Sequence, residues 1–166
     1  DSMDQYLILK QFKSLEETIN LFHENEVIHG DIKPGNIIET PDGEVYFIDF
    51  STAISFKEDF IDRKEGIIFG TSKYFSVDES RSRDFVALGL TMAGVVLKNS
   101  YNWGNFPNKL NLPEIINEIK TRIKREGLYE SADFFDHLMN KSPEYDTVDL
   151  FKGINENINE VSNSNI

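Results

Sequence analysis

The first apolar residues of the chain recur at intervals of four and three, which is the period of an α-helix. They are Ile8, Phe12, Leu15, Ile19 and Phe22. Together they form one stripe along a single helix, which we predict from Asp4 to about Glu24. An alternative is a strand at residues 6–9 and a helix that starts at Ser14, where a capping box with Glu17 can form. We favour the single helix because its stripe continues across Ser14.

A β-hairpin pattern comes next. Residues 44–48 (Glu-Val-Tyr-Phe-Ile) are rich in the β-branched and aromatic side chains that favour strands. They follow a Pro-Asp-Gly turn signal at residues 41–43. Residues 37–40 supply the opposing strand, so the pattern predicts a hairpin.

Four helices account for most of the remaining chain. The first is apolar almost all round, which is typical of a core helix, and we expect Asp84 to open it and Lys98 to end it. The second begins at Leu112-Pro113 and ends near Gly127. The others cover residues 131–140 and about 143–158, and the Asn/Ser-rich tail 159–166 should fray.

Composition favours one soluble domain spanning residues 1–166, because 39% hydrophobic content suffices for one core. The chain has no cysteine, which excludes disulfides and thiolate metal sites. It has no apolar run of about eighteen residues and no basic-then-apolar leader, so we expect no membrane span or secretory signal and a cytoplasmic location. The net charge of −12 disfavours nucleic acid and anionic membranes as partners; charge for solubility alone explains it equally well.

Candidate chemistry lies in residues 29–38, His-Gly-Asp-Ile-Lys-Pro-Gly-Asn-Ile-Ile. This segment, stiffened by Pro34, presents a carboxylate at Asp31, an ammonium at Lys33 and a carboxamide at Asn36. A carboxylate can take a proton from an attacking hydroxyl, and an ammonium can neutralise charge on a moving phosphoryl group. A carboxamide oxygen can bind Mg²⁺, which prefers hard oxygen ligands. The segment therefore indicates phosphoryl transfer.

A second acidic residue, Asp49, follows the second strand of the predicted hairpin. The two acidic residues thus flank one hairpin, and Asp49 supplies a second metal ligand. We expect Asp31 and Asp49 to meet across a narrow gap with Asn36 beside them, so that a divalent cation can bind there.

These residues resemble the catalytic loop and metal-binding motif of eukaryotic-type protein kinases. Residues 70–78 resemble the end of the kinase activation segment, and residues 83–89 resemble the start of the central helix of the large lobe. Four motifs in order are a more specific signal than one. His-Gly-Asp at residues 29–31 and the pattern at residues 76–84 are most similar to the casein-kinase-I-like and vaccinia-related kinases.

The resemblance implies a mainly α fold of the kinase large-lobe type, in which a short β-hairpin carries the catalytic and metal-binding loops. Its parts would be the catalytic loop 29–38, the metal motif 49–51, the activation segment 49–79 and the central helix 84–98. The first glycine is Gly30, so no Gly-rich phosphate loop precedes the catalytic loop. We therefore expect the small lobe to be absent.

The resemblance also implies ATP and Mg²⁺ as cofactors and assigns roles to single residues. The roles are catalysis by Asp31 and Lys33, nucleotide binding by Lys33, Asn36 and Ile38, metal binding by Asn36 and Asp49, and structural support by His29, Phe50, Thr71 and Asp84. Asp84 would bond the backbone of the catalytic loop from below, and Thr71 would bond the Asp31 and Lys33 side chains.

Three positions depart from the family pattern, whereas a fourth, His23, stands where these kinases usually carry a histidine. Glu26 replaces a glycine common at this helix end, so the turn there must differ or be strained. Gly30 replaces the arginine that pairs with an activation-loop phosphate in many kinases, so we do not expect phosphorylation to switch the protein on. Ser51 replaces the glycine usual after Asp-Phe, which reduces backbone freedom. His23 is expected to be a buried structural residue.

Three functions compete. The first is the catalytic half of a serine/threonine protein kinase that acts on a protein substrate and needs a small lobe from a longer chain or a partner. The second is a silent, pseudokinase-type binding module or decoy that docks on another kinase or a substrate. The third is a metal-dependent phosphatase or nuclease, which is remote because the chain has no cluster of histidine ligands. The face at Ile38 and Phe50 should be exposed, or be covered by the first helix or by a second copy in a homodimer.

Overall fold

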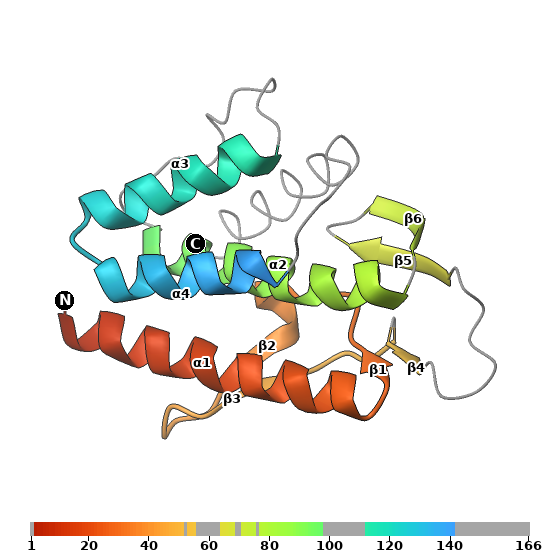
Figure 1. The fold of residues 1–166 in the computed structure, drawn as a ribbon. Helices are drawn as coiled ribbons and strands as arrows, with labels where there is room; N and C mark the ends of the chain where they lie inside the picture. Colours follow the sequence, from red (N-terminus) through yellow and green to blue (C-terminus); the bar gives the residue numbers. More distant parts are fainter. Residues whose placement is uncertain are drawn as a thin grey trace.

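A computed structural model describes residues 2–51, 53–55, 64–68, 71–75, 77–97 and 112–141. Within these ranges the fold is mainly helical, with three small two-stranded antiparallel sheets (Figure 1). The helices are α1 (Ser2–Glu24), α2 (Val77–Leu97), α3 (Leu112–Arg125) and α4 (Tyr129–Asn140). The strands are β1 (Val27–Ile28), β2 (Ile37–Glu39), β3 (Val45–Phe47), β4 (Ile54–Ser55), β5 (Lys64–Ile68) and β6 (Thr71–Phe75). A 3-10 turn at Pro34–Asn36 leads into β2.

The first helix is continuous, as its apolar stripe predicts. Its buried face consists of Leu9, Phe12, Leu15 and Ile19. Ile8 and Phe22 pack against the same core from its edge. Residues 6–9 belong to this helix, so the alternative strand there is wrong.

The turn after α1 is strained, as the glutamate at this position predicts. Glu26 adopts φ 61°, in the left-handed region that glycine tolerates best. Its N–H donates to the carbonyl of His23 at 3.0 Å and closes the helix end. This reversal directs the chain into β1 and then into the predicted catalytic loop.

The predicted hairpin is also present, as β2 and β3. Ile38 pairs with Tyr46 and Ile37 with Phe47, and Gly43 takes φ 88° in the turn. Phe47 is buried, whereas Ile38 and Tyr46 lie opposite each other on the exposed face. The alternation of a strand therefore turns one face of the hairpin toward the core and the other toward solvent.

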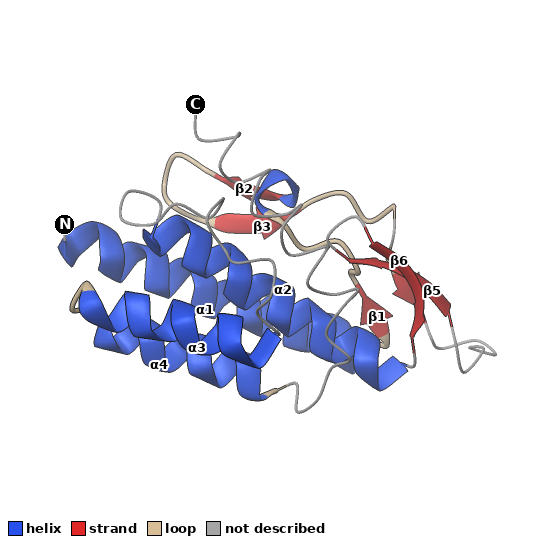
Figure 2. Ribbon diagram, turned by 90° about the horizontal axis from the view of Figure 1, so that it is seen from above, coloured by secondary structure: helices blue, strands red, loops and turns tan. Residues whose placement is uncertain are grey.

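The central helix α2 starts at Val77, so the predicted start at Asp84 is wrong. The reason is that residues 78–84 (Asp-Glu-Ser-Arg-Ser-Arg-Asp) carry no apolar stripe, although they are compatible with a helix. From Phe85 onward nearly every side chain is buried, as predicted for a core helix. In Figure 2, α3 and α4 lie on one side of α2 and the β2–β3 hairpin lies on the other.

Two further helices complete the described fold. α3 covers the predicted range and is followed by Gly127, at φ 77°, while α4 starts at Tyr129 rather than at Ser131. α4 buries Phe134, Phe135, Leu138 and Met139, as predicted. It is joined to α1 by Glu16, whose carboxylate contacts Lys141 Nζ at 3.1 Å and also His137, which is half exposed.

Other predicted features lie partly or wholly outside the described residues. These are the loop 99–111, the helix 143–158 and the tail 159–166. Within the predicted activation segment, β5 and β6 pair as a two-stranded antiparallel sheet in which Gly66 lies opposite Lys73; the sequence pattern did not predict this sheet. None of the helices in the described ranges is long and apolar enough to cross a bilayer.

Candidate functional site

The site is built on the buried carboxylate of Asp84, which is 1% exposed. Its Oδ1 accepts the N–H of Gly30 at 3.0 Å, and its Oδ2 accepts the N–H of His29 at 3.1 Å. His23 Nε2 donates to the same Oδ2 at 2.9 Å. Three donors compensate the burial of the charge, and α1, α2 and the catalytic loop are joined at one group. Asp84 thus bonds the backbone of residues 29 and 30, and His23 lies part-buried against the same carboxylate.

His29 connects the predicted catalytic loop with Ile48, the residue before Asp49. The N–H of Asp31 donates to His29 Nδ1 at 3.1 Å, so Nδ1 is the acceptor and the ring proton lies on Nε2. Nε2 then donates to the carbonyl of Ile48 at 3.0 Å. His29 is fully buried, and its ring therefore fixes the distance between these two segments.

Asn36 holds Asp31 in place. Its Nδ2 donates to the Asp31 carbonyl at 2.7 Å and to Asp31 Oδ2 at 3.0 Å. The carbonyl of Asn36 accepts the N–H of Ile48 at 2.8 Å. Asn36 is therefore bonded to Asp31 through its side chain and to the residue before Asp49 through its backbone. The structure therefore joins Asp31 and Asn36 and places the residue before Asp49 against them.

Asp49 lies at the surface beside this network, with φ 55°. Aspartate tolerates this left-handed region better than most residues. The Ser51 hydroxyl, followed by the Ser51 N–H, lowers the pKa of the Asp49 carboxyl below its usual value by donating hydrogen bonds to it. The charge of Lys33 adds a smaller contribution in the same direction.

The remaining predicted residues occupy distinct places. Lys33 is extended, with φ −157°, as expected before Pro34. The Phe50 ring packs edge-on to Phe22, with ring centroids 5.4 Å apart, and against His29, with ring centroids 4.9 Å apart. It is nevertheless 45% exposed. Ile38 points outward from the hairpin and is 46% exposed. In the single chain both residues are therefore about half exposed, and α1 covers part of the Phe50 ring through Phe22. The side chain of Thr71 lies outside the described part of the structure.

The donor set was tested for its fit to Mg²⁺. In the described ranges no group of three or more His, Cys, Asp or Glu side chains is arranged to hold a metal ion. Mg²⁺ does not need such a cage, because it usually keeps several waters and binds one or two protein oxygens together with substrate phosphates. Asn36 and Asp49, both with hard oxygens and joined through Ile48, fit that description.

Two contacts of the site have no signal in the sequence. The first is made by the backbone of Ile48, an apolar residue. Its carbonyl accepts from His29 Nε2 and its N–H donates to the carbonyl of Asn36, which joins residues 29–38 to the residue before Asp49. The second is the bond from the Ser51 hydroxyl to Asp49, because Ser51 reads only as a departure from the family pattern. Hydrogen bonds made by backbone groups or between neighbouring side chains depend on the folded conformation, so residue types alone do not reveal them.

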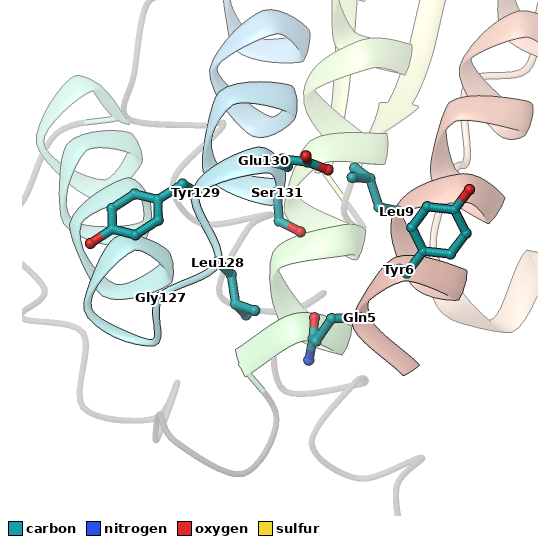
Figure 3. Close-up of a pocket in the computed structure, with 8 residues that line it drawn as sticks. All are labelled: Gln5, Tyr6, Leu9, Gly127, Leu128, Tyr129, Glu130 and Ser131. Atoms are coloured by element: carbon teal, nitrogen blue, oxygen red, sulfur yellow. The ribbon is translucent and has the colours of Figure 1, made fainter. Parts of the chain in front are cut away.

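Of two pockets beside the described helices, one lies apart from this network and the other borders it. One pocket of about 330 Å³ lies between α1 and the start of α4 (Figure 3). It is lined by Gln5, Tyr6, Leu9, Gly127, Leu128, Tyr129, Glu130 and Ser131, none of which belongs to the predicted site. A smaller pocket of about 180 Å³ includes Pro34 and Ile37 of the catalytic loop, together with residues of α1 and α2.

Comparison with known proteins gives kinase-like matches. The RIO domain family model matches residues 8–63, which contain the predicted catalytic loop 29–38 and Asp49. The mitosis inhibitor protein kinase mik1 of Schizosaccharomyces pombe is 28% identical over 142 residues, covering 78% of this chain and 24% of that protein. A probable serine/threonine-protein kinase of Clostridium acetobutylicum is 25% identical over 165 residues, covering 83% of this chain and 25% of that protein.

These findings support a relationship to the protein kinase superfamily. The chain spans about a quarter of the length of the two relatives just named. The interferon-induced, double-stranded RNA-activated protein kinase of Rattus norvegicus is 30% identical over 97 residues, covering 54% of this chain and 18% of that protein. The matches do not single out the casein-kinase-I-like or vaccinia-related group, which stays a prediction.

Proposed function

We propose that this chain is the large-lobe part of a serine/threonine protein kinase-like enzyme, which transfers the γ-phosphoryl group of ATP to hydroxyls of a protein substrate. The observation that carries the proposal is the network in which Asn36 bonds Asp31 directly and is joined to Asp49 through Ile48. The kinase-like matches over these same residues support it. The small lobe would come from the rest of a longer protein or from a partner.

Asp31 is the proposed base. Its Oδ2 is occupied by Asn36, which fixes the carboxylate and leaves Oδ1 for the hydroxyl of a substrate. There Asp31 orients that hydroxyl and accepts its proton as the oxygen attacks phosphorus. A base held in one rotamer loses less freedom when the substrate binds, which favours the in-line geometry.

Asn36 and Asp49 are the proposed ligands of Mg²⁺, which neutralises phosphate charge when it is bound. Asn36 donates to Asp31 through Nδ2 and so turns its amide oxygen away from that carboxylate. Asp49 has a lowered pKa and stays ionised at neutral pH, as a metal ligand must. Lys33 supplies a positive charge for the transferred group, and with Ile38 it would contact the nucleotide.

The experiment is ATP·Mg-dependent phosphate transfer to casein-like acidic and to generic basic protein substrates, using the longest natural protein that contains this chain. Asp31→Asn removes the base and should lower kcat by about 100-fold or more. Asp133→Asn, at an exposed position of α4, is the matched control and should leave the rate unchanged. Transfer that survives Asp31→Asn would refute the assignment. Preference for the acidic substrate would support the casein-kinase-I-like grouping.

A second candidate function is a binding module without turnover. It is favoured by three apolar side chains that are each about half exposed: Ile38 and Tyr46 on the outer side of the hairpin, and Phe50 beside Phe22. Exposed apolar side chains of this kind suit the small lobe of another kinase as a partner. The isolated chain should bind nucleotide no tighter than about millimolar, or about −4 kcal/mol. A Mg²⁺-dependent thermal shift with ATP would favour the enzyme, and its complete absence would favour the module.

A further inference from the structure

Ser51 makes two hydrogen bonds to one oxygen of Asp49. The Ser51 hydroxyl donates to Asp49 Oδ1 at 2.6 Å. The Ser51 N–H donates to the same Oδ1 at 3.2 Å. Both residues are exposed, so these bonds face the solvent from which a cation would arrive.

Two donors on Oδ1 use the lone-pair directions through which that oxygen would bind a cation. Oδ2 takes part in neither bond. A cation at Asp49 therefore meets one prepared oxygen, Oδ2, and one oxygen that it can reach only by displacing the serine hydroxyl. The residue that follows Asp-Phe thus decides how many oxygens Asp49 offers.

We propose that Ser51 is a positioning residue that makes Asp49 a one-oxygen ligand and so favours Mg²⁺ over Ca²⁺. The inference deepens the proposed function and rests on it, because it takes Asp49 as a metal ligand. Glycine at this position would keep the N–H donor but would lack the hydroxyl. The selectivity would therefore distinguish this chain from proteins with glycine after Asp-Phe.

The physical basis is the difference between the two ions. Mg²⁺ requires a nearly regular octahedron of about six oxygens, in which a carboxylate usually occupies one position. Ca²⁺ is larger, takes about six to eight oxygens, and often takes both oxygens of one carboxylate. Blocking Oδ1 costs Mg²⁺ little, whereas it removes the two-oxygen mode from Ca²⁺.

The test measures cation affinity and needs no enzymatic turnover. Mn²⁺ binding to the chain is followed by electron paramagnetic resonance, and Mg²⁺ and Ca²⁺ are titrated as competitors. Ser51→Ala removes the hydroxyl and keeps the N–H, while Ser51→Thr keeps both donors. Ser14→Ala, at an exposed position of α1, is the matched control.

In Ser51→Ala we expect Ca²⁺ affinity to rise relative to Mg²⁺ affinity by about three- to tenfold, the range of one ordinary hydrogen bond. Ser51→Thr and Ser14→Ala should keep the original ratio. An unchanged ratio in Ser51→Ala, with Mn²⁺ still bound, would overturn the role of Ser51 and leave the proposed function standing. Failure of Mn²⁺ to bind the unaltered chain would overturn the role of Asp49 as a metal ligand and the role of Ser51 with it, while the transfer assay with Asp31→Asn tests the proposed function separately.

Discussion

Replacing Asp84 by asparagine tests whether one buried carboxylate holds the catalytic loop. Asp84 accepts bonds from Gly30 N, His29 N and His23 Nε2, two of them at the same oxygen. Asparagine has the same shape but only one acceptor oxygen. If that oxygen takes the place of Oδ2, the amide NH₂ faces the N–H of Gly30. If it takes the place of Oδ1, the NH₂ faces His29 and His23.

In either orientation at least one buried donor loses its partner. An unsatisfied buried donor costs about 1–3 kcal/mol, and hydrogen bonds to a charged acceptor are worth about 1.5–3 kcal/mol each. We therefore expect Asp84→Asn to lower the free energy of unfolding by about 3 kcal/mol. Asp84→Ala removes all three acceptor contacts and should cost about 3–5 kcal/mol, as when one partner of a buried ion pair is deleted.

The assay is equilibrium urea unfolding monitored by circular dichroism. The slope of the free energy of unfolding against urea concentration, m, should be the same for both proteins. Asp133→Asn makes the same chemical change at an exposed position of α4 and should stay within about 0.5 kcal/mol of the unaltered chain. If Asp84→Asn also stays within that range, the carboxylate does not hold the loop and the reasoning fails.

Two further predictions concern the turns on either side of the site. Glu26→Gly should stabilise the fold by about 1 kcal/mol, because glycine avoids the left-handed penalty at φ 61°; urea midpoints would measure it, and Glu24→Gly at the end of α1 should instead destabilise. Thr40→Val should raise the pKa of Asp42, which the Thr40 hydroxyl, and next the Asp42 backbone N–H, hold below its usual value. Since that pKa is depressed, its small stabilising effect exists above the unfolded pKa and is lost as pH falls through the folded pKa. Carbon-13 NMR titration of Asp42 would follow it, and an unchanged value in Thr40→Val would contradict the assignment.

The sequence predicts those parts of the fold in which side-chain period and burial agree. The stripe from Ile8 to Phe22 gave α1 correctly, and the turn residues around Gly43 gave the hairpin. The start of α2 was missed because its first turns carry no apolar stripe. β5 and β6 were missed because residues 64–68 mix charged and apolar side chains without alternation.

The candidate site divides in the same way. The bonds from Asp84 to the loop followed from the kinase resemblance, since an aspartate in a core helix needs donors. The link through Ile48 depends on backbone groups that every residue carries, and no residue type indicates it. The strain at Glu26 could be predicted because glutamate stands where a glycine is common.

The short segment around Phe50 is fastened at both ends. On one side Ile48 is bonded to His29 and Asn36, and on the other Ile54 pairs with Ile28 in the small β1–β4 ladder. Any movement of the Phe50 ring must therefore be accommodated by the backbone of residues 49–53, or else it must break the pairing between β1 and β4. A rearrangement of this segment would register first as lost amide protection in the β1–β4 ladder, before the helices respond.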